Sequence, residues 1–156
     1  MIDSDRVNRA YNGAWLHDAV RRGDIGTVKT LLQNGADPNL LNADGWTALH
    51  YAALHGDIDT VRLFLEHKAD YDKPTVVGNT PLLLAIEYDH QETALLLLEA
   101  GADAMVQGAG GVQPLEIVLR KIKEGKKEFT AVLELIKEKF PEAVVEWWAA
   151  IPGSPS

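Results

Sequence analysis

Residues 44–56 read Asp-Gly-Trp-Thr-Ala-Leu-His-Tyr-Ala-Ala-Leu-His-Gly, and versions of this stretch recur along the chain at a spacing of 33 residues. At that shift, leucine, alanine-aspartate and glycine positions fall into columns. These are Leu16, Leu49, Leu82 and Leu115; Leu32, Leu65 and Leu98; Ala36-Asp37, Ala69-Asp70 and Ala102-Asp103; and Gly45, Gly78 and Gly111. A fixed period of this length is typical of repeat proteins, in which each unit contacts its neighbours.

The apolar spacing within the second unit is helical. Leu49 and Ala52 share one face of a short helix that ends near Gly56, and Val61 begins the inward stripe of a second helix. Residues 68–78 are rich in turn formers and predict an extended hairpin. Neither helix exceeds about three turns, so neither is stable alone. Stability must therefore come from stacking one unit on the next, as in a solenoid.

The unit resembles the ankyrin repeat, whose hallmark is Gly-x-Thr-Pro-Leu-His-x-Ala-Ala, followed by Val-x-x-Leu-Leu and then Gly-Ala-Asp. Residues 45–53 depart from the first motif only at Ala48, and the third unit keeps Pro81 but has Leu83 where histidine is usual. The match covers about residues 10–140. The resemblance implies an all-α solenoid of paired antiparallel helices joined by β-hairpin-like loops.

The resemblance also assigns structural roles to single residues. It implies that the imidazole of His50 hydrogen-bonds turn residues and ties adjacent repeats together. Lys68 stands where the first and third units have glycine, at a position implied to be left-handed, which costs a non-glycine residue about 1 kcal/mol. Asp89 replaces Gly56 one unit later and is better tolerated, because aspartate visits this region more readily.

The predicted organisation is one ankyrin-repeat domain over residues 1–151. Its parts are repeats at about residues 10–42, 43–75, 76–108 and 109–140, an insertion at 121–129 within the last repeat, a capping helix at 141–151, and a tail or linker at 152–156. The linker-like end leaves open that the chain is the amino-terminal portion of a larger protein.

Composition restricts the class of protein. Hydrophobic residues make up 46% and charged residues 24% of the 156 positions, as in a globular domain. The chain has no cysteine, no apolar run long enough to span a bilayer and no signal-like start, which predicts an intracellular, cytoplasmic protein, with the nucleus also possible. The net charge of −8 argues against nucleic-acid binding.

The residue inventory gives no support for catalysis, a metal or a cofactor. The only serines are Ser4, Ser154 and Ser156, far from any rigid support for a nucleophile. The five histidines lack the spacing and the cysteine partners of a zinc site. The glycines of residues 108–111 lack the Gly-Lys-Ser/Thr ending of a phosphate-binding loop and fall in the turn column. We therefore expect a protein that is not an enzyme.

The surface implied to bind partners is the concave face formed by hairpin tips and the exposed side of each unit's first helix. Transferred position by position, the resemblance implies a partner-binding set of Tyr11, Arg21, Arg22, Trp46, Leu54, His55, Val76, Val77, Asn79, Glu87, Tyr88, Val112 and Arg120. Trp46 is the suggested centre, because nothing in the repeat demands an aromatic there. Two interpretations remain open: Trp46 anchors a partner, or it packs on the neighbouring hairpin.

Two segments near the carboxyl end have alternative interpretations. The insertion is basic, with Arg120, Lys121, Lys123, Lys126 and Lys127, and is either a solvated end of the array or a site for an acidic partner. The final helix is either a cap on the last repeat or a docking helix for a partner. Its face is predicted to comprise Val144, Val145, Trp148 and Ile151.

The sequence thus predicts a non-catalytic module that binds a partner protein or peptide through the concave face. The alternative is a regulatory or targeting ankyrin domain of a larger enzyme or channel whose activity lies outside this chain.

Overall fold

The computed structural model describes residues 4–150, with side chains described from residue 12 to residue 149. Within this range the chain is all-α, with nine α-helices, two 3₁₀ turns and no strand. The α-helices are α1 Ser4–Arg21, α2 Ile25–Gln33, α3 Ala48–His55, α4 Ile58–Glu66, α5 Pro81–Glu87, α6 Gln91–Ala100, α7 Pro114–Lys123, α8 Thr130–Lys139 and α9 Pro141–Ala150; the 3₁₀ turns are η1 Ala109–Gly111 and η2 Lys127–Phe129.

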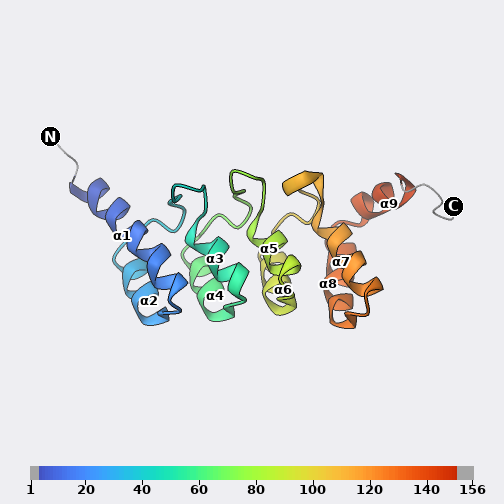
Figure 1. Ribbon diagram of the computed structural model, residues 1–156, viewed down its shortest axis with the longest axis horizontal. Coiled ribbons are helices and arrows are strands. Elements are labelled where there is room, and N and C mark those ends of the chain that lie inside the picture. Colours follow the sequence, from blue (N-terminus) through green and yellow to red (C-terminus); the bar gives the residue numbers. More distant parts are fainter. Residues whose placement is uncertain (1–3, 151–156) are drawn as a thin grey trace.

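The helices form antiparallel pairs that stand side by side in a single row (Figure 1). The pairs are α1/α2, α3/α4, α5/α6 and α7/α8, and each packs on the next. The loops that join successive pairs project together along one edge of the row (Figure 1); we call residues 34–47, 67–80 and 101–113 the finger loops. This arrangement confirms the predicted all-α solenoid of helix pairs.

The leucine column of the sequence forms the centre of the core. Leu16, Leu49, Leu82 and Leu115 are fully buried, one in the first helix of each pair. Ala52 and its counterparts are buried between them, and such small side chains let neighbouring helices approach closely. A helix of about ten residues would not persist alone, so the stack of buried columns is what holds each pair in place.

The finger loops have the hydrogen bonds of a hairpin end without a strand ladder. In the second loop the Thr75 N–H donates to the Asn79 carbonyl and the Gly78 N–H to the Thr75 carbonyl, each at 2.9 Å. Gly78 takes φ 92°, a left-handed backbone that favours glycine. Residues 42–46 and 108–112 repeat the same pair of bonds. The hairpin-like shape is therefore produced by a turn rather than by paired strands.

Histidine side chains join successive repeats, as the resemblance implied for His50. His17 Nε2 lies 2.9 Å from the Trp46 carbonyl oxygen, and His50 Nε2 lies 3.1 Å from that of Asn79. His50 Nδ1 accepts from the Thr47 N–H at 3.0 Å, which leaves the ring proton on Nε2 to donate across the junction. At the next junction Leu83 occupies this position and cannot make the bond.

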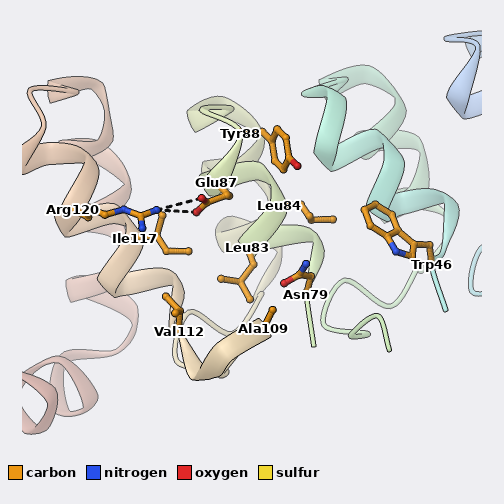
Figure 2. A pocket seen from close by; sticks show the side chains of 10 residues that line it. All are labelled: Trp46, Asn79, Leu83, Leu84, Glu87, Tyr88, Ala109, Val112, Ile117 and Arg120. Carbon is orange, nitrogen blue, oxygen red and sulfur yellow. Dashed lines mark hydrogen bonds and ion pairs between the residues drawn. The ribbon is translucent and has the colours of Figure 1, made fainter. Parts of the chain in front are cut away.

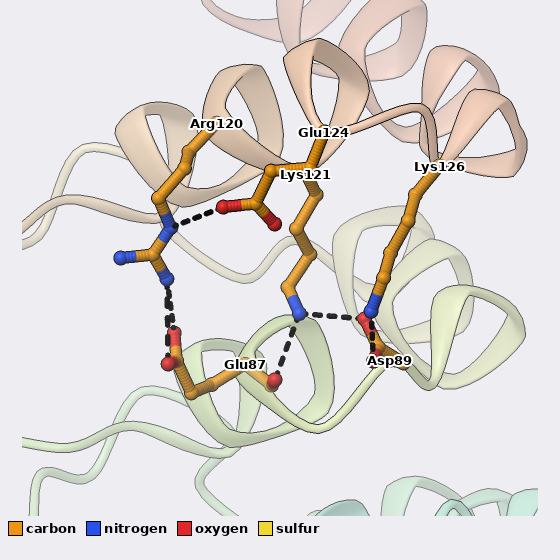
Figure 3. A network of polar contacts seen from close by, with 6 residues as sticks. All are labelled: Glu87, Asp89, Arg120, Lys121, Glu124 and Lys126. Atoms are coloured by element: carbon orange, nitrogen blue, oxygen red, sulfur yellow. Dashed lines mark hydrogen bonds and ion pairs between the residues drawn. The ribbon is translucent and has the colours of Figure 1, made fainter.

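Ion pairs join the third and fourth pairs where the histidine is missing (Figure 3). Arg120 Nη2 lies 3.0 Å from Glu87 Oε2, and Lys121 Nζ lies 2.6 Å from Asp89 Oδ1 and 2.8 Å from the Glu87 carbonyl oxygen. Lys126 also pairs with Asp89. The lysine and arginine charges come from the fourth pair and the carboxylates from the third.

These pairs change the interpretation of the basic insertion. Three of its five basic side chains, Arg120, Lys121 and Lys126, bind carboxylates of the preceding repeat, and Lys121 is only 5% exposed. Lys123 and Lys127 remain exposed. The description of this segment as a solvated end was therefore wrong for Lys121, and most of its charge is already matched inside the chain.

The last helix packs on the fourth pair through a different face from the predicted one. Val144 and Trp147 contact the core, and Trp147 Nε1 donates to Glu116 Oε1 at 3.4 Å. Val145 and Trp148 are exposed, so grouping them with Val144 was wrong. The fourth member of the predicted face, Ile151, and the tail at 152–156 lie outside the described residues.

In the part of the chain that the structure describes, two residues other than glycine adopt positive φ, both at positions where the resemblance implied a left-handed backbone. Lys68 has φ 58° and Asp89 has φ 68°. The corresponding Gly101 and Gly56 have φ 111° and 68°. The left-handed backbone expected at these two positions is confirmed, and Asp89 also pairs with two lysines.

Candidate functional site

A pocket of about 350 Å³ opens on the row between α5, α7 and the finger loops (Figure 2). Its lining comprises Trp46, Asn79, Leu83, Leu84, Glu87, Tyr88, Ala109, Val112, Ile117 and Arg120. Figure 2 shows Leu83, Ile117 and Val112 grouped toward one side of the pocket, with Tyr88 and Trp46 toward the second repeat. The pocket thus lies between the third and fourth repeats and extends toward the second.

The structure brings together six of the predicted site residues in this pocket, namely Trp46, Asn79, Glu87, Tyr88, Val112 and Arg120. Sequence reasoning missed Leu83, Leu84, Ala109 and Ile117. A signal for two of them was present, because Leu84 and Ile117 are the 33-residue counterparts of Tyr51 and so lie on the same side of their helices. For Leu83, the sequence indicated only that the usual histidine is replaced.

The structure shows what the Trp46 ring packs on, while its role as an anchor for a partner stays a prediction. Trp46 is half-buried, and its ring packs on its own repeat, with centroids 4.9 Å from Tyr51 and 5.6 Å from His50. Its backbone is held as well, because the Trp46 N–H donates to Asn42 Oδ1 at 2.9 Å. Trp46 therefore serves the fold and lines the pocket at the same time.

An ion pair closes one end of the pocket (Figure 2). The Arg120 guanidinium binds both carboxylate oxygens of Glu87, at 3.0 and 3.3 Å, and both side chains are about half exposed. The Arg120 Nε also lies 4.0 Å from Glu124. The pocket therefore has apolar side chains along one side and the Glu87–Arg120 ion pair at one end.

Arg21 and Leu54 lie along the same row but outside the pocket. Arg21, Leu54, Glu87 and Arg120 are 33-residue counterparts, so they mark one line across the four first helices. The Arg21 guanidinium lies 5.8 Å from the centroid of the Tyr51 ring. Leu54 is half-buried between the Arg21 and Glu87 positions, and its carbonyl oxygen lies 2.9 Å from His90 Nε2.

Arg22, His55 and Tyr88 form the adjacent line, and all three side chains are exposed. Arg22, directly after α1, pairs with Asp18 of that helix at 3.1 Å. Tyr88, with 56% of its surface exposed, is the member that also faces the pocket. His55 does not line the pocket.

The two valines at the tip of the second finger loop are exposed and lie apart from the pocket. Val76 is close to the first finger loop, where a Cβ added to Gly45 would come within 2.7 Å of its side chain. Two features therefore favour glycine at position 45: the left-handed φ of 75° and the closeness of Val76, which leaves no room for a side chain. Tyr11 is in α1, and its side chain lies outside the described part of the chain.

The ionisable groups near the pocket are occupied by structural contacts. Burial lowers the pKa of His50 to about 4, so this imidazole is neutral near pH 7 with both nitrogens in hydrogen bonds. The side chains described from residue 12 to 149 include no cluster of three His, Cys, Asp or Glu residues that could hold a metal ion. No described helix combines the length and apolarity that crossing a membrane requires.

Four stacked helix pairs with projecting finger loops define a helix-pair repeat solenoid, a class whose members present extended surfaces built from several repeats. The family can also be specified. The family model for ankyrin repeats, in three copies, matches residues 16–107, which is more than half of the chain. The chain therefore belongs to the ankyrin-repeat family, whose members are generally protein–protein interaction modules and typically non-catalytic.

The structure extends the array beyond the matched residues. The helices α7 and α8 continue the row as a fourth pair although their sequence departs from the repeat pattern. A search of curated proteins by sequence finds no match to the chain.

Proposed function

We propose that this chain is a non-catalytic recognition module that binds a segment of a partner protein on the side of the row where the pocket opens. We call this surface the recognition face; it comprises the pocket and the two lines of residues headed by Arg21 and Arg22. The observation that carries the proposal is the apolar pocket between the third and fourth repeats. Concave apolar sites with a few fixed polar groups are the usual places for ligands.

The size and lining of the pocket favour an apolar side chain of a partner. A volume of about 350 Å³ lies at the small end of the range of ligand pockets, roughly 300–1,000 Å³. Leu83, Val112 and Ile117 provide apolar contacts, and the exposed ring of Tyr88 can cover whatever enters. Aromatic side chains beside a buried apolar pocket are typical of the energetic centre of a protein interface.

The polar side chains near the pocket are already bonded to other parts of the chain, which supports recognition rather than catalysis. Glu87 is held by Arg120, and neutral His50 is buried in bonds to the loop backbone. A general acid or base needs a proton-transferring group within reach of a substrate. These two side chains are instead committed to holding adjacent repeats together.

Tyr88→Ala tests the proposal. Twelve-residue peptides would be selected from a random phage-displayed library on the wild-type chain, and their affinities measured by fluorescence anisotropy. We expect Tyr88→Ala to weaken the selected peptides about tenfold or more, because interface aromatics are typically worth about 2 kcal/mol. Its thermal midpoint should stay close to the wild-type value, since the ring is mostly exposed.

Arg62→Ala provides the control. Arg62 is an exposed residue of α4, the second helix of its pair, and it does not line the pocket. Peptides that bind the recognition face should bind this variant as tightly as the wild type. If the selected peptides bind Tyr88→Ala with unchanged affinity, the recognition face has been assigned wrongly.

A further inference from the structure

Among the side chains that the structure describes, one positive charge at an end of the recognition face, Arg21, has no ion-pair partner. Along the line of Arg21, Leu54, Glu87 and Arg120, the last two side chains neutralise each other at 3.0 Å. Arg21 has Leu54 as its neighbour in the next repeat and therefore no carboxylate at the corresponding place. Among the described residues, no Asp or Glu forms an ion pair with Arg21.

The neighbouring arginine, Arg22, does have an ion-pair partner in its own repeat. Arg22 pairs with Asp18, four residues earlier on α1, at 3.1 Å. The residue four positions before Arg21 is His17, whose ring nitrogens contact Gly13 and Trp46 carbonyl oxygens instead. Adjacent arginines on one exposed helix end therefore differ in that only Arg22 has an internal counter-ion.

The Arg21 side chain is held on an ordered aromatic support. Its guanidinium lies 5.8 Å from the centre of the Tyr51 ring. That ring is fixed by the Trp46 ring at 4.9 Å and by Asn42, whose Nδ2 donates to the Tyr51 hydroxyl at 2.9 Å. A guanidinium in contact with an aromatic ring keeps its N–H donors available for a planar carboxylate.

We propose that the segment bound on the recognition face carries a carboxylate for Arg21 and, about six residues away, a large apolar side chain for the pocket. The inference rests on the proposed function and specifies the chemistry of the partner. A single carboxylate matches the one arginine that lacks an internal counter-ion at this end of the face. A dianionic phosphate is disfavoured, because Arg22 is already paired and the chain has a net charge of −8.

The spacing follows from the architecture. Arg21 ends α1, the apolar side of the pocket begins at Leu83 of α5, and α3 lies between these two helices (Figure 1). Packed helices lie about 8–10 Å apart, so the two subsites are about 20 Å apart. An extended chain advances about 3.3 Å per residue, which corresponds to about six residues. The acidic residue can come before or after the apolar one, and the test determines which.

The test uses the peptide library described above. It then exchanges the charges of Arg21 and of the acidic residue in the peptide. We expect selected peptides to share an acidic residue about six positions from Leu, Ile, Met or Phe. A labelled synthetic peptide of the most enriched sequence should bind Arg21→Ala about tenfold more weakly, since a hydrogen bond to a charged group contributes roughly this much. Replacing the acidic residue of the peptide by lysine should weaken wild-type binding similarly, and Arg21→Glu should restore the affinity of that lysine peptide.

The matched control is Arg62→Ala, which removes an exposed arginine of α4 that lies outside the recognition face. It should change affinity less than twofold at constant ionic strength. Selected peptides that depend on Tyr88 but show no acidic preference and bind Arg21→Ala normally would overturn the carboxylate site and leave the proposed function standing. Selected peptides that respond to neither Tyr88→Ala nor Arg21→Ala would overturn both.

Discussion

His50 connects two repeats through a single neutral ring: its Nδ1 accepts from the Thr47 N–H at 3.0 Å while its Nε2 lies 3.1 Å from the Asn79 carbonyl oxygen. The ring is fully buried, and this burial lowers its pKa to about 4. Protonation would place a charge in the core and remove the acceptor that Thr47 uses. The junction between the second and third repeats is therefore sensitive to acid.

The first prediction concerns pH. The pKa of His50 is lower in the folded state than the ordinary value of 6.5, so its stabilising effect is complete above pH 6.5 and is lost as the pH falls toward 4. The shift corresponds to a loss on the order of 3 kcal/mol. Urea unfolding at several pH values should show a steeper acid loss in the wild type than in His50→Leu, a change that copies Leu83 of the next repeat. Parallel pH curves for the two proteins would contradict this assignment.

The second prediction contrasts the two non-glycine residues at positive φ. Lys68→Gly should raise the free energy of unfolding by about 1 kcal/mol, because glycine relieves the left-handed strain. Asp89→Gly should instead lower it by about 2 kcal/mol, since Lys121 is buried and would lose its charged partner. Chemical denaturation of the two variants measures both effects. A gain in stability for both would show that backbone strain alone governs these positions, and a loss for Lys68→Gly would contradict the strain at this residue.

The third prediction concerns a buried hydroxyl. Thr93 is 1% exposed and its Oγ1 has no hydrogen-bond partner, whereas the corresponding Thr60 Oγ1 donates to Asp57 at 2.6 Å. The difference arises because His90 stands where the second repeat has Asp57. Thr93→Val should stabilise the protein by about 1 kcal/mol, by removing an unpaired polar group.

Thr60→Val is the matched control for this hydroxyl, and it should destabilise the protein by a similar amount, because it leaves the Asp57 cap incomplete. Differential scanning calorimetry of both variants gives the comparison. A lower thermal midpoint for Thr93→Val would mean that the hydroxyl has a stabilising role in the folded chain.

The fourth prediction concerns a carboxylate at the base of the finger loops. Burial, with the nearby Asp103 and Asp70 carboxylates, raises the pKa of Asp72, although its Oδ1 accepts from the Asp103 N–H at 2.9 Å. The first repeat has Asn39 here, whose Oδ1 accepts the equivalent bond from the Asp70 N–H. Asp72→Asn should therefore stabilise the protein near pH 7, by less than about 1 kcal/mol.

The pH dependence of this change has a definite sign. An acid whose pKa is raised on folding destabilises the folded state at high pH, and the penalty disappears as the pH falls toward its ordinary value of 3.8. The advantage of Asp72→Asn should accordingly shrink between pH 7 and pH 4 in urea titrations. A gain that is equal at both pH values would point to a cause other than charge.

The repeat register made most of the fold predictable. A column that recurs every 33 residues constrains the same local contacts several times, so the helix pairs and the turn glycines could be derived from sequence. The role of His50 was implied by the resemblance to the ankyrin repeat. Features that occur once could not be derived in this way. The orientation of α9 depends on how Trp147 meets Glu116, which only the packed structure specifies.

The candidate site was predictable in its outline and less so in its detail. Exposed positions on the first helices follow from the register, but the conformation of Trp46 does not, because its ring packs on the neighbouring Tyr51 and His50 rather than projecting outward. The pairing of Glu87 with Arg120 could have been expected from their common column. Opposite charges one repeat apart lie side by side in a stacked array.

The replacement of histidine by ion pairs at the last junction gives the array an uneven response to salt. Added electrolyte weakens attraction between exposed charges such as Glu87 and Arg120, but has little effect on a bond between a neutral imidazole and a carbonyl group. The fourth repeat is therefore the first to loosen as ionic strength rises. Since the pocket is bounded by α5 on one side and α7 on the other, its shape and its ligand affinity would change with that loosening.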